Sequence, residues 1–254
     1  MDQDWGAIVG LAPDDVPHLL VTEGSWWRRE REAQRLAVLT DVRELGAPDW
    51  WWGRWRGRPV VYACVYGAAR TVEPVHVLGQ LGCPAVAQIG SCGGLAPGIR
   101  PGDLVVADRI TAEDGASGHY GAGDAVLPDP GLVRAVVRRA EQRGLAVHTG
   151  PTVTTEVLLR QPDPLVTRWR REGALGVDME SAATVAAAVW TGARGVSALY
   201  AWDDLTVGRS WTDPLPEADD ARRRAAEAAL FELVLEATLP ADIAPVEGIA
   251  TPLG

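Results

Sequence analysis

The chain has 254 residues, a net charge of −10 and 47% apolar residues, which suits a globular protein of one or two domains. All 24 of its lysine-or-arginine positions are arginine, so a lysine-dependent phosphate loop and lysine Schiff-base chemistry are excluded. The acidic balance argues against nucleic acid as a ligand. No run of 18 apolar residues occurs, so no membrane span is expected. The acidic N-terminus without an apolar leader, and three cysteines without metal-ligand spacing, predict a cytoplasmic protein with reduced thiols and no bound metal.

Short apolar runs alternate with helical patterns, which predicts βα units around a mainly parallel or mixed sheet. The predicted strands are 7–10, 60–66, 85–89, 104–110, 174–177 and 196–201. The predicted helices are 28–45, 72–81, 131–143, 164–172, 181–190 and 216–239. No repeat or linker divides residues 1–239, which we expect to form one domain, and the proline-rich residues 240–254 are expected to be loosely held.

Tryptophan is concentrated near the N-terminus. Six of the eleven tryptophans fall between residues 26 and 55: Trp26, Trp27, Trp50, Trp51, Trp52 and Trp55. Packing in the core and at a sheet edge would explain them. The functional alternatives are a subunit interface or an aromatic wall over a flat ligand, because tryptophan is enriched in such places, and we favour the interface.

The segment Val177-Asp178-Met179-Glu180 joins a predicted strand to a predicted alanine-rich helix, where open α/β sheets bind ligands. A carboxylate accepts two hydrogen bonds at once, which suits a vicinal diol, and a thioether adds an adaptable apolar surface. The combination suggests a ribose pocket. An equally open interpretation is that the acids only complement the positive end of the helix dipole.

A glycine-rich turn, Gly90-Ser91-Cys92-Gly93-Gly94-Leu95, follows the predicted strand 85–89 and would let backbone N–H groups approach a ligand. Together with Pro101-Gly102-Asp103-Leu104-Val105-Val106, Val177-Asp178-Met179-Glu180 and Trp202-Asp203-Asp204-Leu205, it resembles the nucleoside phosphorylase and nucleosidase superfamily. That superfamily includes purine nucleoside phosphorylases, uridine phosphorylases and methylthioadenosine/adenosylhomocysteine nucleosidases. The resemblance covers roughly residues 5–235. It implies a single α/β domain, with a mixed twisted central sheet flanked by helices, that forms a homo-oligomer (dimer, trimer or hexamer).

The resemblance also implies roles for particular residues. Glu180 would hold the ribose 2′- and 3′-hydroxyls, and Met179 would pack on the sugar. Asp203 would be the catalytic aspartate, protonated in a pocket that raises its pKa, and would donate to N7 of a departing purine. Asp204 would raise that pKa further by repulsion, although the aspartate pair would also suit a cap on the following loop.

A pocket for the base and the nucleophile is implied around Ser91, Cys92 and Gly93. Leu158 stands where relatives stack an aromatic ring on the base, which is a departure from the family pattern. Trp202, or a tryptophan of the 50–55 cluster, would then have to supply the ring.

The group that attacks the sugar would be water or phosphate. Phosphate requires arginines that bind it in a fork, and the positions of two usual ligands hold Gln88 and Pro17. Asp15 falls where nucleosidases have their general base and would orient a water, unless it is simply an acid at a helix start. Arg43 and Arg70 are the possible phosphate ligands, although each also suits an ordinary surface position. By resemblance to the hexameric members, Arg43 would act across a subunit boundary.

We therefore predict a cytoplasmic, homo-oligomeric enzyme that cleaves the N-glycosidic bond of a purine-type nucleoside. Hydrolysis is slightly favoured over phosphorolysis by a purine nucleoside phosphorylase, in which phosphate would be the co-substrate. No metal, organic cofactor, nucleic acid or membrane partner is expected. A remote alternative is a non-catalytic nucleoside-binding relative, which would keep Glu180 and Met179 without needing Asp203.

Overall fold

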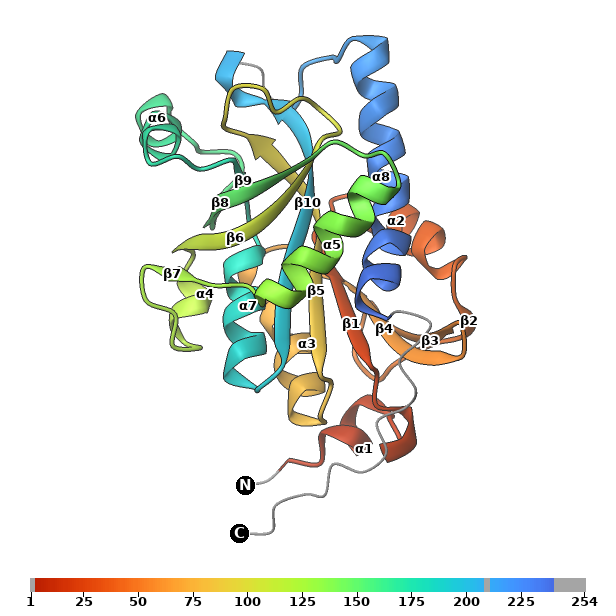
Figure 1. The fold of residues 1–254 in the computed structure, drawn as a ribbon. Coiled ribbons are helices and arrows are strands. Elements are labelled where there is room, and N and C mark those ends of the chain that lie inside the picture. The colour runs from red at the N-terminus through yellow and green to blue at the C-terminus, as the bar shows by residue number, and fades with distance from the viewer. Residues whose placement is uncertain (1–2, 208–210, 240–254) are drawn as a thin grey trace.

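A computed structural model describes residues 3–207 and 211–239. Within these ranges a mixed sheet of ten strands carries helices on both faces (Figure 1), which confirms the predicted fold class. The strands are β1 (Leu19–Glu23), β2 (Thr40–Glu44), β3 (Trp50–Trp55), β4 (Arg58–Cys64), β5 (Ala85–Gly94), β6 (Leu104–Glu113), β7 (Ala125–Val126), β8 (Val147–Thr155), β9 (Gly176–Asp178) and β10 (Arg194–Asp204). The α-helices are α1 (Trp5–Val9), α2 (Arg28–Leu36), α3 (Ala68–Gln80), α4 (Gly115–Gly118), α5 (Pro130–Gln142), α6 (Asp163–Arg171), α7 (Ser181–Trp190) and α8 (Glu217–Thr238).

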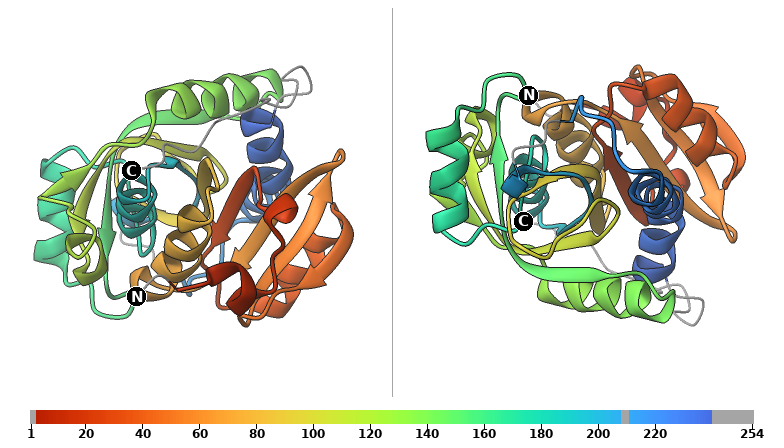
Figure 2. Two further views of the ribbon diagram at one scale, coloured as in Figure 1. Left: turned by 90° about the horizontal axis from the view of Figure 1, so that it is seen from below. Right: turned by 90° about the horizontal axis from the view of Figure 1, so that it is seen from above.

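Part of the sheet closes on itself around β5. Strand β5 pairs with both β9 and β10, while β10 pairs with β6, β6 with β8, and β8 with β9. Strand β1 pairs with the same edge of β5 as β9 does, nearer the amino end of β5, and β1, β4, β3 and β2 extend from there as an open wing (Figure 2). Because β1, β5 and β10 run parallel to one another, their carboxyl ends meet at one edge of the sheet.

The two faces of the sheet are covered by different helices because side chains alternate along a strand. Leu19 and Val21 of β1 belong to the apolar cluster that contains residues of α5 and α8. Leu20, between them, belongs to the cluster that contains residues of α3 and α7. The same separation of helix pairs is visible end-on in Figure 2. All three leucine and valine side chains are at most 1% exposed, so β1 lies in the middle of a three-layer structure.

The predicted strand at 7–10 is wrong, because this segment forms α1. The Asp4 carboxylate accepts a hydrogen bond from the Ala7 N–H at 3.0 Å, and Gly10 ends the helix in the left-handed region at φ 71°. Both are capping features that a short apolar run does not disclose. The first strand of the sheet is instead β1, which the sequence analysis missed.

The predicted helix 28–45 is also wrong in its second half. Helix α2 ends at Leu36, and the chain continues as β2, a strand with mostly exposed residues at the end of the strand order. An exposed edge strand has no buried face, so the period-2 alternation that would identify it is missing.

The tryptophans of β3 pack inside the chain. Trp50, Trp52 and Trp55 are 3%, 4% and 6% exposed, so core packing, rather than the favoured subunit interface, accounts for them. Trp26 and Trp27 differ, with exposed fractions of 49% and 42%. They lie in the connection between β1 and α2.

Across the residues that the structure covers, no helix has both the length and the apolar character needed to cross a bilayer. The predicted loose tail, residues 240–254, lies outside those residues.

Candidate active site

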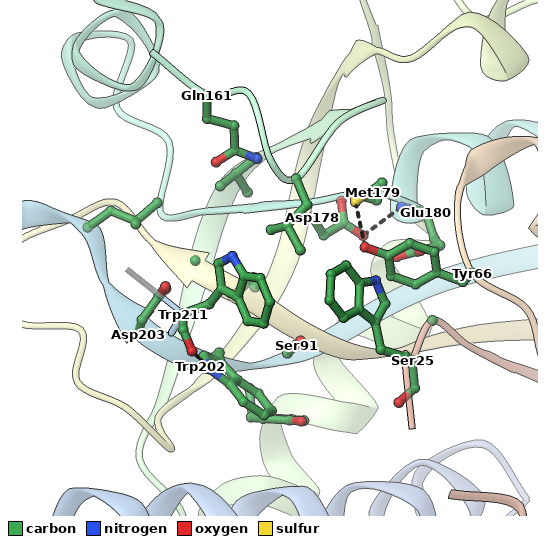
Figure 3. Close-up of a pocket in the computed structure, with 18 of the residues that line it drawn as sticks. Ser25, Tyr66, Ser91, Gln161, Asp178, Met179, Glu180, Trp202, Asp203 and Trp211 are labelled. Carbon is green, nitrogen blue, oxygen red and sulfur yellow. Dashed lines mark hydrogen bonds between the residues drawn. The ribbon is translucent and has the colours of Figure 1, made fainter. Parts of the chain in front are cut away.

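A cavity of about 400 Å³ opens at the edge where the carboxyl ends of β1, β5 and β10 meet. Figure 3 shows side chains from widely separated parts of the chain around it. The cavity brings together eight residues that the sequence analysis assigned to the site: Ser91, Cys92, Gly93, Leu158, Met179, Glu180, Trp202 and Asp203. Ligands bind at this edge in open α/β sheets generally.

Strand pairing explains why these segments converge. Gly93 of β5 pairs with Val177 of β9 on one side and with Asp203 of β10 on the other. The chain leaving β9 places Glu180 at one side of β5, while a register shift between Ala201 and Asp203 places the aspartate at the opposite side. The glycine-rich end of β5 therefore lies between the two carboxyl groups.

Two glycines allow the backbone to approach these carboxyl groups closely. A Cβ at Gly24 would lie 2.4 Å from Oε1 of Glu180. A Cβ at Gly93 would lie 2.7 Å from Cδ1 of Leu205 and 3.3 Å from Oδ1 of Asp203. Real Cβ atoms do not tolerate the shorter of these distances, so a larger residue at either position would displace the side chain of Glu180 or Leu205.

Glu180 is 6% exposed and faces the cavity. One of its oxygens accepts a hydrogen bond from the Gly67 N–H at 2.7 Å. Burial, with the negative charge of Asp178 adding to it, raises the pKa of Glu180 to about 8. Asp178 itself accepts hydrogen bonds from the Ser181 N–H and hydroxyl. The helix-start interpretation of this segment thus describes Asp178, whereas Glu180 is available to a ligand.

Met179 forms an apolar part of the cavity wall beside Glu180. The Tyr66 hydroxyl donates to its sulfur at 3.4 Å, as the dashed line in Figure 3 shows. This contact fixes an otherwise flexible side chain. The pair of a fixed thioether and a carboxylate matches what a pentose ring requires.

Asp203 is 4% exposed, and its Oδ1 has no hydrogen-bond partner among the described residues. Burial raises the pKa of Asp203 to about 7, and the charges of Asp204 and Asp213 act in the same direction. The Asp204 carboxylate accepts hydrogen bonds from the Thr206 N–H and hydroxyl at 2.8 and 2.6 Å. Asp204 therefore caps the loop, and a pKa of about 7 means that Asp203 is partly protonated near neutral pH.

Four tryptophans line the cavity: Trp202, which the sequence analysis assigned to it, Trp26 and Trp27, for which an aromatic wall was one interpretation, and Trp211. Trp27 stacks on Trp202 with ring centroids 5.4 Å apart and planes 7° from parallel. Trp26 meets Trp211 edge to face at 4.9 Å. None of the four tryptophans between residues 50 and 55 lines this cavity, although Leu158 does. The aromatic surface comes instead from Trp26 and Trp27, which follow β1, from Trp202 near the end of β10, and from Trp211.

Cys92 is 2% exposed, and burial raises the pKa of its thiol well above the ordinary value, helped by Asp178 and Asp203. The side chain is therefore a neutral thiol. It acts as part of the wall rather than as a nucleophile, because nucleophilic attack requires a thiolate.

Asp15 and Arg43 lie outside the cavity. The Arg43 guanidinium donates to the Asp15 carboxylate at 3.1 Å, and the Trp52 indole N–H donates to the Asp15 carbonyl at 2.8 Å. Asp15 precedes β1, so it lies toward the amino end of that strand, whereas the cavity opens at the carboxyl end. The sequence analysis had placed the first strand too early. Asp15 is thus not placed to activate water in the cavity of its own chain, and Arg43 is not placed to bind phosphate there. The expectation that Arg43 acts across a subunit boundary stays a prediction.

Arg70 also lies outside the cavity. It lines a neighbouring surface hollow together with Arg28, and its Nε is 3.7 Å from a carboxylate oxygen of Glu73.

A buried ion cluster forms one wall of the cavity. Glu23 and Arg31, which are 1% and 7% exposed, line the cavity together with Tyr200. Behind them, Arg35 donates two hydrogen bonds of 3.0 Å to the Glu23 carboxylate, and Arg31 pairs with Glu227. We call Glu23, Arg31, Arg35 and Glu227 the arginine cluster. The sequence analysis missed it because α2 and α8 are distant in the chain.

The sequence was compared with known families and proteins. The phosphorylase superfamily matches residues 51–238, and the chain belongs to this family, as its motifs predicted. A guanosine phosphorylase of Halorubrum lacusprofundi is 28% identical over 79% of this chain and 90% of its own length. A DeoD-type purine nucleoside phosphorylase of Jannaschia sp. is 25% identical over 90% of this chain and 97% of its own. A uridine phosphorylase of Haemophilus influenzae is 26% identical over 64% and 71%.

Among solved structures, uridine phosphorylase from Vibrio fischeri superposes with a TM-score of 0.77. The match covers 89% of this chain and 93% of that one at 19% identity. At this identity the likeness concerns the fold, and it agrees with the mixed sheet described above.

Proposed function

We propose that the protein cleaves the N-glycosidic bond of a purine-type nucleoside by phosphorolysis. Membership of the phosphorylase superfamily confirms the prediction of an enzyme that breaks nucleoside glycosidic bonds. The observation that carries the finer proposal is that Glu180 and Asp203 open on one cavity from opposite sides of β5. A pentose held by the first residue would present its base to the second.

In the proposed reaction, the sugar hydroxyls donate to Glu180 while Met179 packs on the ring. Asp203 transfers its proton to N7 of the purine as the bond between C1′ and N9 breaks, which makes the base a neutral leaving group. A phosphate oxygen forms the new bond to C1′ as positive charge develops on the sugar. A pKa of about 7 leaves a substantial fraction of Asp203 protonated at neutral pH.

Phosphate as the acceptor is supported by the relatives. The three curated proteins described above are named guanosine, purine nucleoside and uridine phosphorylases. This argument outweighs the preference for water drawn from Asp15, since that residue lies outside the cavity.

Hydrolysis remains a second candidate because of one observation. The cavity wall carries five carboxylates and, among the described residues, a single arginine, Arg31. The carboxylates are Glu23, Asp163, Asp178, Glu180 and Asp203. Gln88 provides no charge, and it is buried and accepts a hydrogen bond from the Thr22 hydroxyl. Such a wall attracts a phosphate anion less than it attracts neutral water.

The two candidates are separated by supplying inosine, guanosine and adenosine to the purified protein with and without phosphate. We expect base release that depends strictly on phosphate, with pentose 1-phosphate as the second product. Base release at the same rate without phosphate, with pentose as the product, would establish hydrolysis instead. Absence of base release under both conditions would count against both candidates.

A further inference from the structure

We propose that Arg31 of α2 is the cation that holds inorganic phosphate in the cavity. This inference rests on the proposed phosphorolysis and names the residue that makes it possible. Arg43 and Arg70, the arginines named from the sequence, lie outside the cavity of their own chain. Arg31 lines the same cavity as Gly24, at the end of β1, and Ser91, at the end of β5.

The contacts of Arg31 leave part of its guanidinium available. Its Nη1 pairs with Glu227 and donates to the Gln34 side chain at 3.1 Å. Its Nε lies 3.9 Å from Glu23, beyond hydrogen-bond distance. Neither Nε nor Nη2 has a hydrogen-bond acceptor among the described residues. These two groups form one edge of the guanidinium fork, and a fork edge is the geometry that binds two oxygens of a phosphate.

The carboxylates nearest Arg31 are engaged by other arginines as well. Arg35 binds both oxygens of Glu23, which also accepts a hydrogen bond from the Tyr62 hydroxyl at 2.9 Å. Arg223 lies 3.6 Å from Glu227. Arg223 is bound more closely to Asp220, at 2.6 Å, so within the arginine cluster two arginines balance two glutamates. A phosphate can bind Arg31 without meeting an unpaired carboxylate in this wall.

Glu227 also fixes the direction of Arg31. The arginine is 7% exposed and its Nη1 is already paired with Glu227, so its side chain loses little conformational entropy when an anion binds. An exposed arginine would have to be ordered first. Arg28, one turn earlier on α2, illustrates the difference: it is bound to Asp49 at 2.8 Å and lines the neighbouring hollow rather than this cavity.

The test compares the variants Arg31→Gln and Arg31→Lys with the matched control Arg28→Gln from the same helix. Phosphate binding is measured by calorimetry with inorganic phosphate alone, and KM is measured for phosphate and for inosine. For Arg31→Gln we expect Kd and KM for phosphate to rise about 10- to 100-fold, as the loss of charge-assisted hydrogen bonds implies. KM for inosine should change less than about twofold, and Arg28→Gln should match the wild type in every respect.

Arg31→Lys keeps the charge toward Glu227 but lacks the fork, so it should fold and still bind phosphate several-fold more weakly. It decides the matter if Arg31→Gln does not fold. Wild-type phosphate affinity in a folded Arg31 variant would overturn this inference while leaving phosphorolysis intact. A wild-type protein that binds no phosphate and releases base without it would overturn the proposed phosphorolysis, and the role of Arg31 with it.

Discussion

Two sets of buried carboxylates lie in or directly behind the wall of one cavity, and they differ in their partners. Glu180 and Asp203 are 6% and 4% exposed, and no arginine of residues 3–207 and 211–239 pairs with them. The pKa values of the two groups are raised to about 8 and about 7. Glu23 and Glu227 are buried to a similar degree, but arginines bind them. The contrast teaches that burial alone does not identify a catalytic carboxylate. A buried acid that has no arginine partner can hold or release a proton near neutral pH, whereas a paired one stays ionised.

The largest effect is expected at the unpaired aspartate. Asp203→Asn removes the proton donor but keeps the shape, so kcat should fall by about 10²- to 10⁴-fold, the range for loss of a general acid. The matched control is Asp204→Asn, which alters the loop cap beside it. Steady-state kinetics with inosine gives both values. Equal losses in the two variants would mean that the loop, rather than the proton, matters.

The arginine-paired set should respond through stability. Glu23→Gln leaves Arg35 buried with a weakened partner, and breaking a buried ion pair typically costs about 3–5 kcal/mol. The free energy of unfolding, measured in urea, should therefore fall by an amount of that order. Asp203→Asn, by contrast, should unfold at the same or a higher urea concentration than the wild type. The reverse ranking would contradict the distinction between the two sets.

Glu180→Gln should weaken the hold on the sugar. Loss of hydrogen bonds to a buried carboxyl group predicts a fall in kcat/KM of about 10- to 100-fold for inosine. The loss should largely vanish for 2′,3′-dideoxyinosine, which lacks both hydroxyls. Glu73→Gln, an exposed change outside the cavity, serves as the control. A loss that is the same for both substrates would show that Glu180 does not contact those hydroxyls.

The raised pKa of Asp203 predicts two effects of rising pH: the wild type loses activity, and it loses stability relative to the Asp203→Asn variant. The wild-type kcat/KM should fall as the pH rises through about 7, because the acid form is lost. The folded state binds the Asp203 proton more tightly than the unfolded state, so the protonated side chain makes its full contribution to stability in acid. This contribution is lost as the pH rises from 3.8, the ordinary pKa of aspartate, towards about 7, the pKa in the folded protein. The Tm advantage of Asp203→Asn should therefore grow between about pH 5 and about pH 8.

The smallest effect is expected from the exposed ion pair near the N-terminus. Asp15 and Arg43 have side chains 28% and 39% exposed, and such pairs contribute little to stability. Asp15→Asn and Arg43→Gln should each leave kcat/KM within about twofold of the wild type, since surface changes act weakly. A large loss of activity in either variant would return these residues to the catalytic machinery.

The sequence predicted the site best where a motif coincides with the end of a strand. Each motif of the site follows or ends a buried apolar run: Gly90 to Gly94, Asp178 to Glu180, and Asp203. These motifs converge because parallel strands end at the same edge of the sheet. The spacing of the motifs was sufficient because the sheet converts order along the chain into position in space. The prediction of both ribose- and base-facing carboxyl groups depended only on these segments.

The sequence predicted least where helix caps and long-range pairs decide the structure. The apolar segment 7–10 fits a strand or a helix equally, and the caps at Asp4 and Gly10 select the helix. The arginine cluster joins Glu23 to α2 and α8 across most of the chain, and its residues carry no local pattern. Trp211 was missed for the same reason, because its contact with Trp26 exists only in the folded protein.

The central claim, that one cavity holds a pentose between Glu180 and Asp203, is tested most directly by a crystal structure of Asp203→Asn with bound inosine. The account predicts the ribose 2′- and 3′-hydroxyls within hydrogen-bond distance of the Glu180 carboxyl group and N7 of the base facing residue 203. A nucleoside bound in the hollow beside Arg28, or bound in the cavity with its base against Glu180, would contradict it.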